Sequence, residues 1–375
     1  MENGLAVIGI FILFIAISYA GLIIFFTTGW YKVSFIPNVT RSGKRVSVIV
    51  AMRDEEKNVA LLLEDLTGQN FPVELTEIIL VDDHSKDGTF RVVEEFILKH
   101  NRPDIIFIKN EDENLNGKKA ALELGINRAQ GEIILTTDAD CRAGKDWIGS
   151  LMAGFSDESV QMVFGFVAYS GLNSTADHFQ ALEFAGLVAS GAGAAGAGHP
   201  FICNGANLAY RKTAFQTVGG FSGNEDFLSG DDVFLLHKIK KHFGRKTIVF
   251  SKDKRSVVTT FPAPGIGAFI RQRIRWASKS KGYRDFLSVL TALTVFSFSL
   301  ALLSSLVLGL INPVFFIVTA GLVALKMMVD YPLLLGITNF SGNKNSLKRY
   351  WFFQLIYPFY IVTTGILSLF NRKSW

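Results

Sequence analysis

Short apolar runs alternate with longer amphipathic segments through the first half of the chain. They lie at residues 46–50, 77–81, 105–109 and 133–135. These runs are rich in β-branched side chains and are bounded by polar residues. Such a pattern favours buried strands of a parallel sheet, because both faces of that sheet are covered. Strands that alternate with helices predict an α/β fold with a mostly parallel sheet and right-handed crossovers.

Much longer apolar runs lie near both ends of the chain. They cover residues 5–26, 286–311, 314–337 and 350–370. Each is about long enough to cross the hydrocarbon core of a bilayer. Residues 1–4 carry no Lys or Arg, which a secretory signal would have, so we expect a retained anchor rather than a cleaved peptide.

These patterns divide the chain into segments of different character. We expect an anchor at residues 1–30, an α/β domain at 45–260, a basic interfacial segment at 261–285 and membrane helices at 286–375. Residues 160–170 read as one further strand. Residues 186–198 are rich in Gly and Ala. We expect a flexible loop there, with a helix-packing face as the alternative.

Composition agrees with a soluble domain joined to membrane segments. The chain has 33 Phe, only 19% charged residues, a mean hydropathy of +0.30 and a net charge of +5. A basic excess can serve nucleic acid, anionic lipid or phosphate-bearing ligands. No zinc-finger, aromatic RNA-binding or helix-turn-helix pattern is present, so we expect no nucleic-acid partner. Two cysteines, Cys141 and Cys203, give no disulfide framework.

Positive charges predict the orientation in the membrane. Four cations follow the first apolar segment: Lys32, Arg41, Lys44 and Arg45. By the positive-inside rule we expect an integral protein of the cell (inner) membrane with its central domain in the cytoplasm. Arg372 and Lys373 would then lie outside, which is opposite to the rule. The orientation of the last apolar segment is therefore left open.

Two of the predicted strands end in carboxylates. The run at residues 133–135 leads to Asp138 and Asp140, and the run at residues 77–81 leads to Asp83. Ligands of open α/β sheets bind at the carboxyl ends of strands. Paired carboxylates there form a hard oxygen site, which suits Mg²⁺ or Mn²⁺ held partly by substrate phosphates. The alternative is a solvated turn, in which Asp is common.

Other charged positions have both a functional and a structural interpretation. Asp231 and Asp232 begin a helix, where a carboxylate can simply be a cap. Residues 270–276 form a basic helical stretch that can lie on a membrane surface. Lys326 and Asp330 are four residues apart inside an apolar segment, so we expect them to pair or to face a polar cavity. No Gly-x-Gly-x-x-Gly follows the first strand and no Gly-x-x-x-x-Gly-Lys-Ser/Thr is present, so the sequence supports neither a dinucleotide fold nor a P-loop.

Six short motifs, taken in order, resemble membrane-associated glycosyltransferase family 2, and especially its processive, cellulose-synthase-like members. The resemblance spans residues 46–282 and includes the flanking apolar segments. It implies the GT-A fold, a nucleotide-diphospho-sugar transferase domain. The motifs are Val50-Ala-Met-Arg-Asp-Glu-Glu-Lys-Asn58, Val81-Asp-Asp-His-Ser-Lys-Asp-Gly-Thr89, Gly117-Lys-Lys-Ala120, Asp138-Ala-Asp140, Gly230-Asp-Asp232 and Gln272-Arg-Ile-Arg-Trp276.

The resemblance also implies how the donor is bound. A nucleotide sugar, with a UDP-sugar as the first choice, would lie against Ala51, Arg53, Glu55, Asp83, Lys118 and Asp138. Asp83 would accept a hydrogen bond from uracil, and its alternative is a helix-capping carboxylate. Lys118 precedes a helix, where a cation can meet the diphosphate. Asp140 would hold Mg²⁺ or Mn²⁺, which neutralises charge on the departing diphosphate.

The same resemblance assigns the acceptor side. Asp232 matches the catalytic base, which takes the proton of the attacking hydroxyl in an inverting transfer. Asp231 stands where many relatives have Glu, so either Asp remains a candidate. Gln272, Arg275 and Trp276 match the Gln-x-x-Arg-Trp motif. Arg275 would contact the diphosphate, and Trp276 would stack on a sugar ring.

The expected function is a membrane-bound, metal-dependent, inverting glycosyltransferase. It would move a sugar from a nucleotide-diphospho-sugar to a lipid-linked or polysaccharide acceptor. The alternatives are a catalytically inactive, glycosyltransferase-like membrane partner and a small transporter. Most of the chain is soluble in character, which speaks against the transporter, and every expected acidic position is filled, which speaks against inactivity.

Overall fold

The computed structural model describes residues 2–35, 43–102, 104–112, 117–223 and 230–370. The chain forms two compact units. One unit is helical and contains Met1–Lys32, Leu172–Ala197 and Pro262–Trp375. The other is an α/β unit and contains Val33–Gly171 and Gly198–Phe261. Arg41, Arg372 and Lys373, which entered the predicted orientation, lie outside the described residues.

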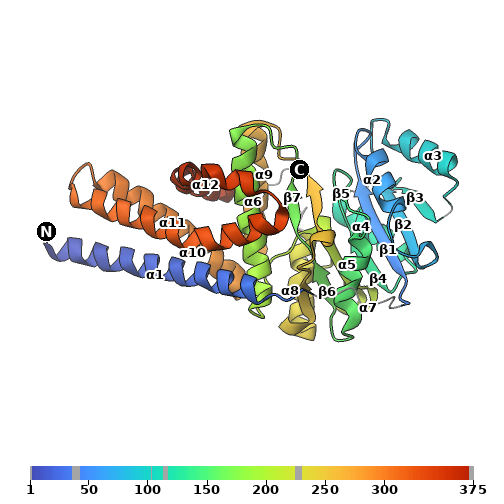
Figure 1. Cartoon of the computed structure of the whole chain (residues 1–375), viewed down its shortest axis with the longest axis horizontal. Helices are drawn as coiled ribbons and strands as arrows, with labels where there is room; N and C mark the ends of the chain where they lie inside the picture. Colours follow the sequence, from blue (N-terminus) through green and yellow to red (C-terminus); the bar gives the residue numbers. More distant parts are fainter. Residues whose placement is uncertain (1, 36–42, 103, 113–116, 224–229, 371–375) are drawn as a thin grey trace. The chain divides into compact units, whose positions relative to one another are not determined.

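The α/β unit is built on a mostly parallel sheet (Figure 1). Its strands are β1 (Val46–Met52), β2 (Thr76–Asp82), β3 (Ile105–Lys109), β4 (Ile133–Thr136), β6 (Met162–Phe164), β8 (Leu208–Arg211) and β9 (Ile248–Phe250). Within the described residues their order is β3-β2-β1-β4-β8-β6-β9. β1 pairs in parallel with β2 and β4, whereas β8 is antiparallel to both of its neighbours. The predicted α/β fold is confirmed.

A smaller sheet lies in the same unit. It consists of β5 (Arg142–Ala143), β7 (Val167–Tyr169) and β10 (Val258–Thr260). β10 is antiparallel to β5 and parallel to β7. The prediction of one strand over residues 160–170 is therefore wrong, because β6 and β7 belong to different sheets. The chain turns at Gly165, where a side chain would overlap the amide group of Asn207.

Helices cover the α/β sheet. They are α2 (Val59–Thr67), α3 (Thr89–His100), α4 (Lys118–Arg128), α5 (Trp147–Met152), α7 (Lys212–Thr217) and α8 (Asp231–Phe243). Short 3₁₀ turns of this unit are η1 (Val73–Leu75), η2 (Ala153–Ser156), η3 (Gly205–Asn207), η4 (Arg245–Thr247) and η5 (Lys254–Ser256). α4 packs closely on β1, since a Cβ added at Gly125 would lie 2.7 Å from Cγ2 of Ile49. A side chain at this position would push α4 away from the sheet.

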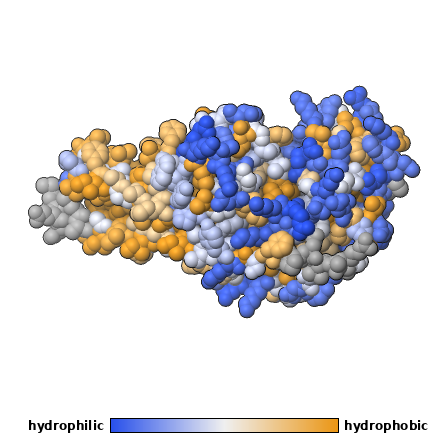
Figure 2. Space-filling view, in the orientation of Figure 1, coloured by the Kyte–Doolittle hydropathy of each residue, from blue (hydrophilic) through white to orange (hydrophobic). Residues whose placement is uncertain are grey.

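The helical unit contains the long apolar segments. Its helices are α1 (Glu2–Lys32), α6 (Thr175–Gly196), α9 (Gly265–Lys279), α10 (Phe286–Leu308), α11 (Val314–Ser341) and α12 (Tyr350–Phe370), with 3₁₀ turns η6 (Ser280–Gly282) and η7 (Lys344–Arg349). Among the described residues, four helices are long and apolar enough to cross a membrane: α1, α10, α11 and η7–α12. Figure 2 shows apolar side chains gathered over α1, α10 and α11. The predicted membrane segments are present as helices.

Residues 186–198 are not the loop that we expected. Residues 186–196 complete α6, which begins with a capping box formed by Ser174 and Asp177. α6 crosses α1 closely, because a Cβ at Gly193 would overlap the backbone of Phe26, and one at Gly29 would overlap that of Gly193. Small residues permit such a crossing, so the alternative of a helix-packing face is the one observed. α6 therefore belongs to the helical unit and interrupts the predicted 45–260 domain.

The two charges inside α11 pair, as expected. Lys326 and Asp330 form an ion pair and are 2% and 8% exposed. The hydroxyl of Tyr19 in α1 donates to Oδ1 of Asp330 at 2.8 Å. Nζ of Lys326 also lies 4.2 Å from the ring centroid of Tyr357 in α12. This polar cluster joins α1, α11 and α12 at buried positions of apolar helices.

Candidate active site

The carboxyl ends of β1, β2 and β4 bring the predicted donor-binding residues to one edge of the sheet. Met52 at the end of β1 is in register with Asp82 at the end of β2, and its carbonyl accepts a hydrogen bond from the backbone N–H of Asp83 at 2.8 Å. β4 lies on the other side of β1, with Thr136 in register with Ile49. Parallel strands end at a common edge, which is where α/β sheets bind ligands.

Asp83 is buried and holds other parts of this edge together. It is 2% exposed, and its Oδ2 accepts a hydrogen bond from the backbone N–H of Gly117 at 2.9 Å. Its Oδ1 lies 3.1 Å from Nδ1 of His84. Asp83 thus fixes Gly117, the residue that precedes α4.

Two residues near this edge adopt a backbone conformation that is uncommon for residues other than Gly. Asp54 has φ = 57° and His84 has φ = 60°. The loops that carry them are tied together, because the N–H of Asp54 donates to Oγ of Ser85 and the N–H of Lys86 donates to Oδ1 of Asp54. Left-handed backbone in non-Gly residues clusters at functional sites. No sequence pattern had singled out His84.

Lys118, at the start of α4, stands among acidic groups. Its Nζ lies 2.5 Å from Oδ1 of Asp138, which follows β4. Burial by itself would lower the pKa of Lys118, but the charges of Asp138, Asp231 and Asp232 outweigh it and raise that pKa above its ordinary value. The structure therefore brings together a predicted diphosphate-binding cation and both predicted acidic pairs.

Asp140 is held by the smaller sheet. Its Oδ2 accepts a hydrogen bond from Oγ1 of Thr260 in β10 at 3.1 Å, and its Oδ1 lies 3.6 Å from Sγ of Cys141. Burial, and then the charge of Asp138, raise the pKa of the Asp140 carboxyl. A cation close to this pair would offset both effects.

The donor set around Asp140 fits a hard divalent cation that is only partly held by protein. Carboxylate oxygens of Asp138 and Asp140 are the ligands that Mg²⁺ and Mn²⁺ prefer. Among the described residues, no three His, Cys, Asp or Glu side chains gather closely enough to hold a metal ion by themselves.

Residues that follow β1 lie near the same acidic pair. Burial is the main cause that raises the pKa of Glu55, and a hydrogen bond from Nδ2 of Asn58 opposes it. The charges of Asp140 and Asp138 add to the upward shift. Arg53 is exposed and lies 4.0 Å from the carboxylate of Asp54, while Ala51 lies within β1, one residue before its end, in register with Val81. Among Ala51, Arg53 and Glu55, Glu55 is therefore the residue whose pKa the charges of Asp138 and Asp140 raise.

Asp231 and Asp232 begin α8 after Gly230, whose φ of 95° favours glycine. Oδ2 of Asp232 accepts a hydrogen bond from the N–H of Gly205 at 2.9 Å, and its Oδ1 accepts one from the N–H of Val233 at 2.8 Å. Asp231 is buried at 7% exposure, whereas Asp232 is partly exposed. Of the two, Asp232 is the more accessible to a second substrate.

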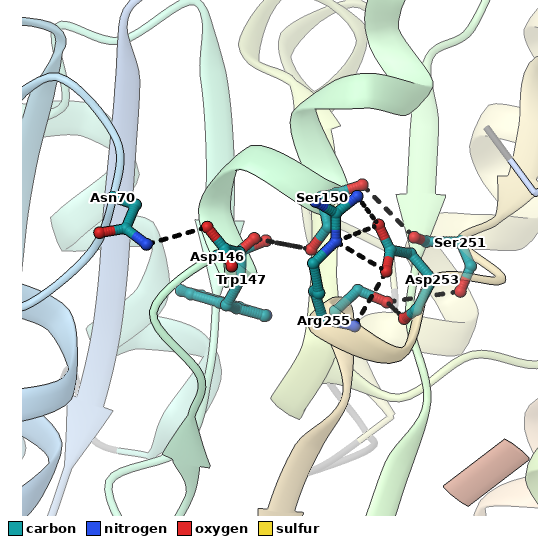
Figure 3. Close-up of polar contacts among 8 residues, drawn as sticks. Asn70, Asp146, Trp147, Ser150, Ser251, Asp253 and Arg255 are labelled. Carbon is teal, nitrogen blue, oxygen red and sulfur yellow. Dashed lines mark hydrogen bonds and ion pairs between the residues drawn. The ribbon is translucent and has the colours of Figure 1, made fainter. Parts of the chain in front are cut away.

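A polar cluster that sequence reasoning missed supports the loop before β10 (Figure 3). Nη2 of Arg255 donates to Oδ2 of Asp253 at 2.7 Å, and Oγ of Ser256 donates to the carbonyl of Asp253 at 2.7 Å. In the same cluster, Asn70 donates from Nδ2 to Oδ1 of Asp146 at 3.0 Å. These contacts fix the chain that enters β10 and so place Thr260, the partner of Asp140. The contacts of Asp253 with Arg255 and Ser256 are local in sequence, whereas Asn70 and Asp146 lie 76 residues apart, and no local pattern connects them.

The predicted Gln-x-x-Arg-Trp residues lie on α9 in the helical unit. Trp276 packs 5.7 Å from Phe184 of α6, and the guanidinium of Arg273 lies 4.2 Å from its ring centroid. Oε1 of Gln272 accepts a hydrogen bond from Nη1 of Arg273 at 2.6 Å. Arg275 is partly exposed. The buried arginine of this helix is therefore Arg273, which we had not named as a candidate.

Comparison with known proteins finds glycosyltransferases among the relatives of this chain. The model described as Glycosyl transferase family 2 matches residues 47–219. Glycosyltransferase AglE of Haloferax volcanii is 26% identical over 235 residues, which are 61% of this chain and 71% of AglE. A Methanococcus voltae protein, dolichyl N-acetyl-alpha-D-glucosaminyl phosphate 3-beta-D-2,3-diacetamido-2,3-dideoxy-beta-D-glucuronosyltransferase, is 24% identical over 277 residues, or 71% of this chain and 82% of that protein.

A solved structure has the same fold. Mannosyltransferase PcManGT from Pyrobaculum calidifontis, in complex with GDP-Man and Mn²⁺, aligns with 98% of this chain and 99% of its own, with a TM-score of 0.62 and 20% identity. At that identity the likeness concerns the fold. The α/β unit is a GT-A domain. Residues 47–219, which carry these strand-end carboxylates, match glycosyl transferase family 2, and the protein is a glycosyltransferase.

Proposed function

We propose that the protein is membrane-bound and transfers a sugar from a nucleotide-diphospho-sugar to an acceptor hydroxyl, with inversion at the anomeric carbon. The observation that carries this proposal is the position of Lys118. Lys118 forms an ion pair with Asp138, next to Asp140. The charges of the second acidic pair, Asp231 and Asp232, help to raise its pKa. One pair would face the leaving group and the other the attacking hydroxyl.

The donor would bind at the carboxyl ends of β1, β2 and β4. Lys118 would meet the diphosphate at the start of α4, where the helix N-terminus also favours negative charge. The nucleoside would lie against the remaining donor-side residues, namely Ala51, Arg53, Glu55, Asp83 and Asp138. A UDP-sugar is our first choice, and a GDP-sugar belongs in any test because PcManGT is a complex with GDP-Man.

The proposed metal is Mg²⁺ or Mn²⁺, with Asp140 as its protein ligand. The support is the carboxylate pair itself, whose like charges and partial burial favour a nearby cation. When bound, such an ion neutralises charge on the departing nucleoside diphosphate. The chain's own contribution is to hold Asp140 through Thr260 and to balance Asp138 through Lys118.

Asp232 is the proposed base. Its greater exposure and its place at the start of α8 support this choice over Asp231. The N-terminus of a helix favours the ionised carboxylate, which a base needs in order to take the acceptor's proton. Asp231, buried beside it, would tune the local charge rather than touch the acceptor.

The acceptor is proposed to be lipid-linked or a polysaccharide at the membrane surface. Trp276 would stack on an acceptor sugar beside Gln272, and Arg275 would contact the diphosphate. Apolar helices flanking the family-2 segment support a membrane-proximal acceptor. The name of the Methanococcus voltae relative includes a dolichyl-phosphate-linked sugar, which is of this class. We also propose a location in the cell (inner) membrane with the GT-A domain in the cytoplasm.

The function is tested with the purified protein in lipid nanodiscs, a panel of UDP- and GDP-sugars, and membrane extract as acceptor. Release of nucleoside diphosphate and transfer of labelled sugar are measured with Mn²⁺, with Mg²⁺ and with EDTA. We expect turnover of one donor class, lost with EDTA and in Asp140→Asn. Asp157→Asn, a change at an exposed surface carboxylate, should match the wild type. Absence of release with every donor contradicts the proposal.

A further inference from the structure

The structure assigns a positioning role to Arg273. We propose that Arg273, fixed by Glu183 and Tyr360, sets the orientation of Gln272 and Trp276 and thereby the affinity for the acceptor. The part concerning the acceptor rests on the proposed function of those two residues. The positioning itself stands on contacts within the helical unit.

Arg273 is almost completely enclosed and its charge is paired. It is 3% exposed, and its Nε and Nη2 donate to Oε2 of Glu183 at 2.9 and 2.5 Å. The other carboxylate oxygen, Oε1, accepts a hydrogen bond from the hydroxyl of Tyr360 at 3.0 Å. Glu183 lies on α6, Arg273 on α9 and Tyr360 on α12, so this contact joins three helices that are far apart in the sequence.

The same guanidinium touches both motif residues. Its Nη1 donates to Oε1 of Gln272 at 2.6 Å, and its centre lies 4.2 Å from the ring centroid of Trp276. A planar guanidinium can bind a carboxylate and an amide along its edge while an aromatic ring covers its face. One buried group therefore fixes an amide and an indole at the same time. Rotation of Arg273 would move both.

Aromatic side chains enclose the pair. Phe269 lies 4.7 Å from the guanidinium and stacks on Tyr360 at 5.3 Å. Phe179 contacts the rings of Phe269 and Tyr360 edge-on at 5.9 and 5.8 Å. Removing one partner of an enclosed ion pair leaves an uncompensated charge, so the remaining groups must rearrange. Gln272 and Trp276 are the groups in contact with Arg273 that would move with it.

The two arginines of the motif region thus have different surroundings. The guanidinium of Arg273 donates hydrogen bonds to Glu183 and Gln272. The described residues give the side chain of Arg275 no hydrogen bond or ion pair, and it is partly exposed. This leaves Arg275 available for a ligand, while Arg273 shapes the surface beside it.

The test compares Glu183→Gln and Tyr360→Phe with Tyr350→Phe. Tyr350 is on the same helix as Tyr360, and its hydroxyl donates to the carbonyl of Met327 at 2.7 Å, so the control removes an equivalent hydrogen bond elsewhere. Acceptor KM, donor KM and kcat are measured for each. Because the chain has five Trp residues, emission of Trp276 is obtained by subtracting the same variant in a Trp276→Phe background.

We expect Glu183→Gln to raise acceptor KM by on the order of 10- to 100-fold, as for a displaced binding group, with donor KM within about twofold. Tyr360→Phe should show a smaller rise, and both variants should shift the Trp276 emission. Tyr350→Phe should change neither. A joint rise of donor and acceptor KM, or an unchanged Trp276 emission in Glu183→Gln, overturns the proposal.

The test also covers a variant that does not fold and a wild type that transfers no sugar. If Glu183→Gln does not fold, Tyr360→Phe decides, and equality with Tyr350→Phe in acceptor KM and emission overturns the proposal. If the wild type transfers no sugar, the proposed function fails. The Trp276 emission then still tests the positioning role by itself, since it needs no substrate.

Discussion

Nζ of Lys118 lies 2.5 Å from Oδ1 of Asp138 and so joins the start of α4 to the end of β4. The two residues are separated by a whole helix and strand in the sequence, but the start of that helix and the end of that strand lie together at one edge of the sheet. The pair places a cation where a helix N-terminus points, next to a carboxylate that belongs to the proposed metal-binding pair. A diphosphate bound there would exchange one anionic partner of Lys118 for another.

Lys118→Met should weaken binding of the nucleoside diphosphate. A hydrogen bond to a charged group contributes about 1.5–3 kcal/mol, so we expect a Kd roughly 10- to 100-fold higher by calorimetry. Lys119→Met is the matched control, since Nζ of Lys119 lies 5.6 Å from the ring centroid of Phe234 and carries no proposed contact with the donor. Equal effects of the two changes would show that general charge, not Lys118, governs donor binding.

The strands of the GT-A domain could be predicted because their pattern is local. Residues 46–50, 77–81 and 133–135 are short β-branched runs, and each lies within an observed strand or coincides with part of one. The carboxylates that follow them then had to meet, because parallel neighbours end together. Acidic positions such as Asp138 were therefore recognisable without knowing any contact.

Other features depend on partners that a local pattern does not contain. The Gly/Ala-rich composition of residues 186–198 is typical of a loop. In the structure most of them are helical, and Gly193 lets α6 pack closely against α1. Residues 160–170 looked like one strand, and their division at Gly165 follows from Asn207 in a distant segment. Arg273 resembled the other cations of its helix, and only Glu183, ninety residues away in sequence, distinguishes it.

Asp140→Asn should remove metal binding while the fold is kept. The amide is nearly isosteric and can still accept the hydrogen bond from Thr260, but it lacks the charge that attracts a divalent cation. Mn²⁺ binding in the presence of nucleoside diphosphate, followed by electron paramagnetic resonance, should be lost, and the circular dichroism spectrum should be unchanged. Wild-type Mn²⁺ affinity in this variant would rule Asp140 out as the ligand.

The proposed orientation predicts which side of the membrane exposes the GT-A domain. Protease added to intact cells should leave the domain whole, and the same protease added to opened membranes should digest it. The physical reason is the group of cations at and after the end of α1, of which Lys32, Lys44 and Arg45 are described. Digestion in intact cells would reverse the orientation.

Lys326 and Asp330 inside α11 should stabilise the helical unit only when both charges are present. Lys326→Met leaves the buried carboxylate of Asp330 without its cation, which typically costs about 3–5 kcal/mol. We therefore expect a lower Tm in detergent. Lys326→Met combined with Asp330→Asn should recover most of the loss, because the amide can still accept from Tyr19. A double variant no more stable than the single one would mean that the charges are not coupled.

The role of Asp232 as the base is tested most directly by comparing the turnover of Asp232→Asn and Asp231→Asn with that of the wild type. Donor binding is measured on the same preparations. Removing the proposed base while keeping its size should lower turnover by roughly 10²–10⁴-fold, the usual contribution of general base catalysis, with donor Kd little changed. Asp231→Asn should lower it less, since that side chain is buried. A larger loss in Asp231→Asn would move the base by one residue, and full turnover in both variants would contradict the mechanism.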